Sequence, residues 1–198
     1  MLPPHPGFSG LFQNLIPASR KNANRKQAVD AHASKKHRQA LLARAAQGDK
    51  AALREAASSD SQLYDEALNL MVDAADSEPA LLALASHVMG DNSLRVNPKL
   101  ARRIRESWKS NPTRGGTSKM LHITARANDA KLLDESIEVA LEFWRLERIP
   151  EMSAMELLSL FNGEFWTLSS EQRSSGAGFV LKRTLARCQR ELQPAASL

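Results

Sequence analysis

Residues 132–149, LLDESIEVALEFWRLERI, carry the strongest helical pattern in the chain. On a helical wheel their apolar side chains fill roughly twice the ~100° arc that an ordinary surface helix buries. We therefore expect neighbouring helices to cover this segment on two sides. The remaining ridge, which includes Asp134, Glu138 and Glu142, is acidic. The pattern predicts the central helix of an all-α domain.

The composition of the rest of the chain also favours helices over strands. Ala and Leu dominate its 198 residues, and only 5% of them are aromatic. From residue 41 onward, short helical patterns alternate with connections of a few residues, as at Asp49 and at Asn97-Pro98. This spacing predicts a multi-helix bundle or a short α-solenoid of antiparallel helical pairs. We expect a hook and a basic arm at residues 1–40, and a single helical domain at residues 41–193.

A short amphipathic segment near the N-terminus ends at Pro17. Its apolar face is too large for a segment of this length that stands alone, so it needs a surface on which to dock. That surface is the protein's own domain, a groove on a protein partner, or a membrane. We interpret the segment as a partner-binding hook. Its apolar positions follow helical spacing, and they are Phe8, Leu11, Phe12, Leu15 and Ile16.

Residues 18–40 form a basic arm with a single large apolar residue, Val29. This composition is typical of a flexible segment or of a solvated helix. The scarcity of acids also resembles a mitochondrial transit peptide, although the early prolines and the apolar hook argue against that interpretation. With one cysteine, Cys188, and no secretory apolar region, we expect a cytoplasmic protein.

Charge alternates along the chain in blocks of about forty residues. Residues 19–44, 95–131 and 173–198 are net basic, and residues 45–94 and 132–172 are net acidic. One interpretation is that basic and acidic helices pair as neighbours in the fold. The other is that a basic block forms a surface for a polyanion. If helix 98–109 or helix 179–192 lies across the acidic ridge of 132–149, the first interpretation holds.

The candidate nucleic-acid surface is centred on the basic helix predicted at residues 98–109. Leu100, Ile104 and Trp108 form its apolar side. A loop with Gly115-Gly116 is expected to follow. The cations that would contact backbone phosphates, from the helix and this loop, are Lys99, Arg102, Arg103, Arg105, Lys109, Arg114 and Lys119.

No constellation of residues points to catalysis. The five histidines lack the spacing that places two metal ligands on one helical face, and there is no HExxH or CxxC. Cys188 lies in an apolar stripe, where we expect it in the core. The GGTSK sequence at 115–119 lacks P-loop spacing. We therefore expect no enzyme activity, no cofactor and no metal.

The last helices have apolar positions that we expect in the core. These positions are Met155, Leu158 and Phe161 in one helix, and Phe179, Leu181 and Leu185 in the next. Gly176 and Gly178 interrupt the latter pattern, which indicates close helix contact or a break. The sequence supports two hypotheses of function. The first is a non-enzymatic helical adaptor that binds a protein partner or itself. The alternative is a nucleic-acid-associated regulatory protein that uses the basic arm and helix 98–109.

Overall fold

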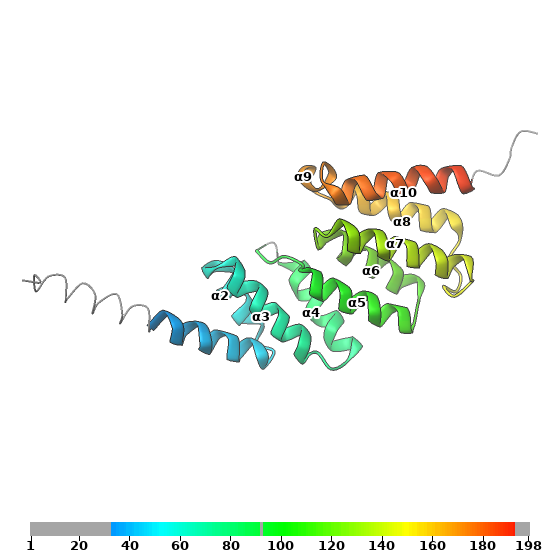
Figure 1. Cartoon of the computed structure of the whole chain (residues 1–198). Coiled ribbons are helices and arrows are strands. Elements are labelled where there is room, and N and C mark those ends of the chain that lie inside the picture. Colours follow the sequence, from blue (N-terminus) through cyan, green and yellow to red (C-terminus); the bar gives the residue numbers. More distant parts are fainter. Residues whose placement is uncertain (1–32, 92, 193–198) are drawn as a thin grey trace, which may run out of the picture. The chain divides into compact units, whose positions relative to one another are not determined.

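The computed structural model describes residues 33–91 and 93–192. The chain divides by its backbone contacts into two units, Met1–Ala40 and Leu41–Leu198. In the first unit, residues 33–40 are helical. The second unit contains the helices discussed below (Figure 1). The hook and most of the basic arm lie outside the described residues.

The described chain consists of helices joined by short connections, which confirms the predicted all-α fold. Residues 41–46 are helical, and a turn at Gly48 with φ 83° separates them from the next helix. The helices that follow are α2 (Lys50–Ser59), α3 (Ser61–Ala74), α4 (Glu78–Gly90), α5 (Pro98–Ser110), α6 (Arg114–Arg126), α7 (Ala130–Arg145), α8 (Ala154–Thr167), α9 (Ser170–Arg173) and α10 (Gly176–Leu192).

Side-chain caps fix the helix starts. Asp49 accepts a hydrogen bond from the Ala51 amide at 2.9 Å, and Asn97 accepts one from the Leu100 amide at 2.9 Å. Each cap satisfies an amide that has no partner within its own helix. Helix starts at Asp49 and at Asn97-Pro98 were expected from the sequence, and both are confirmed.

The helices of the second unit pack in pairs that follow one another along the chain. α3 contacts α5, α5 contacts α7, and α7 contacts α10, so these four helices form one row. α4 packs on α5, α6 packs on α5 and α7, and α8 packs on α6 and α10 (Figure 1). This row determines which charged helices become neighbours.

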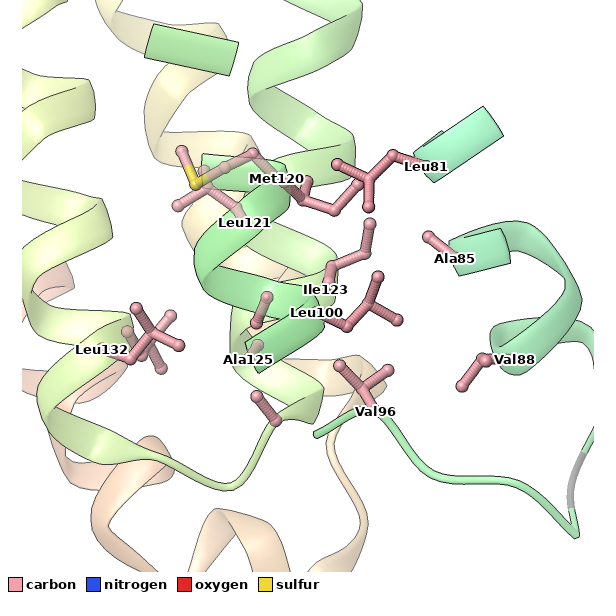
Figure 2. Packing of buried hydrophobic residues seen from close by; sticks show 14 of the residues in the cluster. Leu81, Ala85, Val88, Val96, Leu100, Met120, Leu121, Ile123, Ala125 and Leu132 are labelled. Atoms are coloured by element: carbon pink, nitrogen blue, oxygen red, sulfur yellow. The ribbon is translucent and has the colours of Figure 1, made fainter. Parts of the chain in front are cut away.

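The core lies between the helices of this row and those packed behind it. Leu81 and Val88 of α4, Leu100 of α5, and Met120 and Ile123 of α6 are all buried, and they converge in Figure 2. Burying a side chain of this size stabilises a fold by about 1.5–3 kcal/mol. Because surface ion pairs contribute less, this packing provides most of the stability.

α7 is covered on two sides, as its wide apolar arc predicts. It contacts α5, α6 and α10, and Trp108 of α5 stacks on Phe143 with ring centroids 5.3 Å apart. The helix ends at Arg145, earlier than the predicted segment 132–149. Glu147 adopts a left-handed conformation with φ 55°, which stops the helix and leaves Leu146 59% exposed.

The loop predicted around Gly115-Gly116 is wrong. α6 already begins at Arg114, because the Thr113 side chain accepts a hydrogen bond from the Gly116 amide at 3.0 Å and caps the helix. A β-carbon on Gly116 would lie 2.8 Å from the Thr113 hydroxyl oxygen, so a glycine suits this position. Arg114 and Lys119 therefore belong to a helix and not to a loop.

Two of the apolar residues expected in the core are exposed. Met155 of α8 is 73% exposed and Phe179 of α10 is 65% exposed, whereas Phe161 and Leu181 are buried as expected. Close helix contact or a break was expected at the glycines, and both occur, since α9 ends at Arg173 and α10 begins at Gly176. A β-carbon on Gly176 would lie 2.7 Å from the β-carbon of Ala130 in α7.

Among residues 33–91 and 93–192, no helix has the length and apolar character needed to cross a membrane.

Candidate partner-binding surface

The hook is the first candidate site predicted from the sequence. Its five apolar residues, Phe8, Leu11, Phe12, Leu15 and Ile16, lie outside the described residues. Partner binding through them stays a prediction from the sequence.

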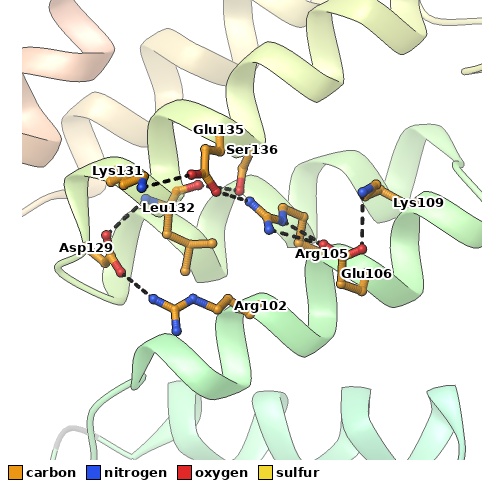
Figure 3. Close-up of polar contacts among 9 residues, drawn as sticks. All are labelled: Arg102, Arg105, Glu106, Lys109, Asp129, Lys131, Leu132, Glu135 and Ser136. Carbon is orange, nitrogen blue, oxygen red and sulfur yellow. Dashed lines mark hydrogen bonds and ion pairs between the residues drawn. The ribbon is translucent and has the colours of Figure 1, made fainter.

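The basic residues of α5 are mostly engaged with carboxylates of neighbouring helices. On the α3 side, Lys99 pairs with Asp73 at 2.6 Å. On the α7 side, Arg102 pairs with Asp129 at 3.2 Å, and Arg105 pairs with Glu135 at 2.8 Å (Figure 3). α5 therefore lies between two acidic neighbours, and its positive charge is largely compensated within the fold.

The remaining cations of the proposed nucleic-acid surface divide into two groups. Lys109 pairs with Glu106 of its own helix at 3.2 Å, and Arg114 pairs with Glu156 of α8. Arg103 and Lys119 are exposed and form no ion pair with the described residues. Of the seven cations expected to contact phosphates, two keep an uncompensated charge.

α10 compensates the acidic ridge of α7 from the other side. Arg183 pairs with Asp134 at 2.6 Å, and Arg187 pairs with Glu138 at 2.7 Å. A basic helix was expected to lie across this ridge, and α10 does so at these two carboxylates. Along the row α3, α5, α7 and α10, acidic and basic helices alternate. This arrangement confirms the interpretation that the charge blocks pair internally.

These ion pairs select helix neighbours more than they stabilise the fold. The side chain of Arg183 is 66% exposed and that of Asp134 is 36% exposed, so water screens their attraction. Exposed pairs of this kind are worth ~0–1 kcal/mol each. Their main consequence is that the row presents little net positive charge to a polyanion.

A second surface, which the sequence pattern does not predict, lies where α8, α9 and α10 meet. The large side chains of Trp166 and Phe179 are 64% and 65% exposed. Phe165, next to Trp166, contacts it edge to face with ring centroids 5.3 Å apart. We call the residues of this surface the aromatic strip, and they are Phe165, Trp166, Arg173, Phe179 and Lys182.

Cations lie over the rings of the aromatic strip. The Arg173 guanidinium lies over the Trp166 ring at 5.5 Å from its centroid, and the Lys182 ammonium lies over the Phe165 ring at 5.4 Å. Contacts of this kind are worth about 0.5–1 kcal/mol at exposed sites. They hold the long cationic side chains against the aromatic rings.

The orientation of α8 explains why this surface is exposed. The buried positions of the helix are Leu157, Phe161 and Glu164, which follow helical spacing. Glu164 accepts a hydrogen bond from the Thr167 hydroxyl, and its carboxylate lies 2.7 Å from Nδ1 of His122 in α6. Because a glutamate occupies the inward face, Trp166 is turned outward.

The apolar pattern of α8 in the sequence indicates the wrong inward face for this helix. Met155, Leu158 and Phe161 suggest an apolar stripe, whereas the real inward face contains Glu164, which pairs with the half-buried His122 of α6 in the fold. Once Glu164 is recognised as inward-facing, the exposed position of Trp166 follows from helical geometry.

The described residues include a wide, open depression of about 850 Å³ after α7, which Trp144 and Met152 line, and a smaller pocket. The smaller pocket, of about 120 Å³, lies between α4, α5 and α6, where Trp108 and Lys119 line it. It is smaller than typical small-molecule sites of ~300–1,000 Å³. Burial raises the pKa of the Cys188 thiol, which disfavours the reactive thiolate. No group of three potential metal ligands occurs in the part of the chain that the structure describes.

Comparison with known proteins gives no relative from which a function could be inferred. The chain matches no protein-family model, no curated protein sequence and no solved structure.

Proposed function

We propose that the protein is a non-enzymatic helical adaptor that acts by binding another protein. The observation that carries this proposal is the contrast between its two surfaces. Most cations of α5 and two arginines of α10 pair with carboxylates, while Trp166 and Phe179 remain more than 60% exposed. Exposed aromatic side chains of this size are typical anchors of protein interfaces.

The apolar hook supports the same function from the sequence. Phe8, Leu11, Phe12, Leu15 and Ile16 have the spacing of a helix that binds in a groove. The adaptor therefore has two candidate contact elements, the hook and the second unit. The hook has no charged residues, and the folded domain has its own exposed aromatic side chains. Two separate contact elements of this kind would allow the protein to join two partners.

Deletion of residues 1–17 tests whether the hook is a contact element. We expect the truncated chain to lose partner capture or self-association while its melting temperature stays nearly unchanged. Capture is measured by affinity purification, self-association by light scattering, and the melting temperature by circular dichroism. A large drop in melting temperature would show instead that the hook belongs to the folded core.

The alternative function, nucleic-acid association, has weaker support in the folded domain. The remaining support for this alternative is the basic arm and the two uncompensated cations Arg103 and Lys119. Phosphate contacts weaken steeply as salt rises. Titration of the full chain with random duplex and single strands at ~50 mM salt tests this alternative, and absence of binding there eliminates it.

A further inference from the structure

The aromatic strip is continuous across three helices. Arg173 of α9 lies over Trp166 of α8, Trp166 contacts Phe165, and Phe165 lies under Lys182 of α10. Phe179 precedes Lys182 by three residues, so the two side chains lie about one turn apart on α10. The strip therefore combines aromatic rings with two cations that contact them, and Phe179 lies one helical turn from one of these cations.

The cations of the strip differ from their neighbours in having no carboxylate partner. Arg183 pairs with Asp134 at 2.6 Å, but the adjacent Lys182 forms no ion pair with the described residues, and its ammonium lies over the Phe165 ring. Arg173 likewise has its ring contact and no carboxylate among the described residues. The acid closest to Arg173 in sequence is the exposed Glu171, two residues before it, and Glu171 forms no ion pair with the described residues.

We propose that the aromatic strip binds an acidic amphipathic segment of a partner protein, an inference that rests on the proposed adaptor function. Apolar side chains of that segment pack on Trp166 and Phe179. Its carboxylates pair with Lys182 and Arg173, which keep their ring contacts. A partner with both features satisfies the rings and the cations at the same time.

The geometry favours a peptide over a nucleic acid. Single strands bind by stacking bases on open ring faces. Here cations lie over faces of Trp166 and Phe165 at 5.5 and 5.4 Å from the centroids, which reduces the ring surface open to stacking. Carboxylates approach the same cations from the side without displacing them.

Neither the hook nor the acidic ridge of α7 supplies the matching segment. The hook and the residues before it contain no acidic side chain. The acidic ridge of α7 is engaged by α10 at Asp134 and Glu138. A separate protein therefore fits the strip better than a second copy of this chain.

The test uses the indole N–H signals of the isotope-labelled full chain in NMR spectra. Trp166 is 64% exposed, whereas Trp108 is 4% exposed and serves as an internal reference. The probe is a synthetic amphipathic peptide of about 14 residues with leucines on one face and glutamates beside them. A second peptide carries glutamine in place of every glutamate. A single-stranded DNA oligonucleotide is titrated separately.

We expect the acidic peptide to shift the Trp166 indole signal and to leave the Trp108 signal unchanged. The Trp166→Ala substitution should weaken binding about tenfold or more, and Lys182→Glu about fivefold. The matched controls Leu146→Ala and Lys119→Glu change an exposed apolar side chain and an exposed cation elsewhere. We expect them to change the affinity less than about twofold.

Three results would overturn the proposal. One is the absence of any Trp166 shift at ~1 mM acidic peptide. Another is equal binding of the glutamine peptide, and the third is tighter binding of the oligonucleotide that is lost in Trp166→Ala. The adaptor function fails separately, if neither deletion of residues 1–17 nor Trp166→Ala changes partner capture. If only the deletion reduces capture, the adaptor stands and the role of the strip is wrong.

Discussion

Arg183 of α10 donates a hydrogen bond to the Asp134 carboxylate of α7 at 2.6 Å. The two residues come from blocks of opposite charge that are separated by almost fifty positions. Their contact shows how the alternating charge pattern of the chain becomes a pattern of neighbouring helices. A net-basic protein thereby folds with a largely compensated row of helices.

The coupling between Asp134 and Arg183 is expected to be small. We predict that Asp134→Lys and Arg183→Glu each lower the free energy of unfolding by less than about 1 kcal/mol. The charge-swapped double variant should recover part of that loss, because the pair is restored with reversed sign. Urea unfolding of the four proteins measures the coupling. A coupling well above ~1 kcal/mol would show that this exposed pair contributes to stability directly.

The buried carboxylate of Glu164 should be more important for stability. It is 7% exposed and lies against His122 and the Thr167 hydroxyl. We predict that Glu164→Ala lowers the free energy of unfolding by about 1–3 kcal/mol, because the half-buried His122 loses its carboxylate partner.

Glu171→Ala is the matched control for that substitution. Glu171 is exposed in the short helix α9, so its removal should change stability by less than about 0.5 kcal/mol. Chemical denaturation of both variants gives the comparison. Equal effects of the two substitutions would contradict the assigned role of Glu164 in orienting α8.

Acid should destabilise the fold partly through Asp91. The Ser93 hydroxyl and the Arg54 guanidinium lower the pKa of the Asp91 carboxyl from 3.8 to about 2. Because the folded state holds this carboxylate ionised, its stabilisation is present above the unfolded pKa and is lost as the pH falls from 3.8 through about 2.

Asp91→Asn removes the group and therefore its pH dependence. We expect the urea midpoint of this variant to change less than that of the wild type between pH ~4.5 and pH ~2.5. Asp76→Asn is the control, because Asp76 is exposed and has no ion pair among the described residues. An unchanged acid dependence in Asp91→Asn would contradict the prediction.

The buried Cys188 should react slowly in the native protein. Its side chain is 1% exposed, and burial raises the pKa of its thiol. At pH ~8 a chromogenic disulfide reagent should modify it much faster in urea than in buffer. Rapid modification of the folded protein would show that α10 opens easily or that the thiol is accessible.

The sequence is sufficient to predict most of the helices, and it offers pairing by charge as one of two interpretations of the charge blocks. Asn97-Pro98 marks a helix start by local capping chemistry, and the wide apolar arc at 132–149 indicates a helix covered on two sides. Pairing between basic and acidic helices follows from the attraction of opposite charges. A capping signal depends only on adjacent residues, and a charge block is a sum over many residues. Both can therefore be read from a single sequence without knowledge of the tertiary contacts.

The exposed aromatic surface could not be predicted in the same way. Whether Trp166 faces inward depends on Glu164, and a glutamate faces inward only where a partner such as His122 meets it. That contact joins residues far apart in the chain. The exposed position of Phe179 likewise follows from how α10 packs on α8. Helical periodicity alone does not show which neighbour is present.

Site-specific photocrosslinking tests the central claim most directly. A photoreactive phenylalanine analogue replaces Trp166 in one full-length protein and Arg103 in another, and each is irradiated in cells that make the protein. Our account predicts a discrete protein adduct from position 166 and none from position 103. Nucleic-acid adducts at position 103, with no protein adduct at position 166, would contradict it.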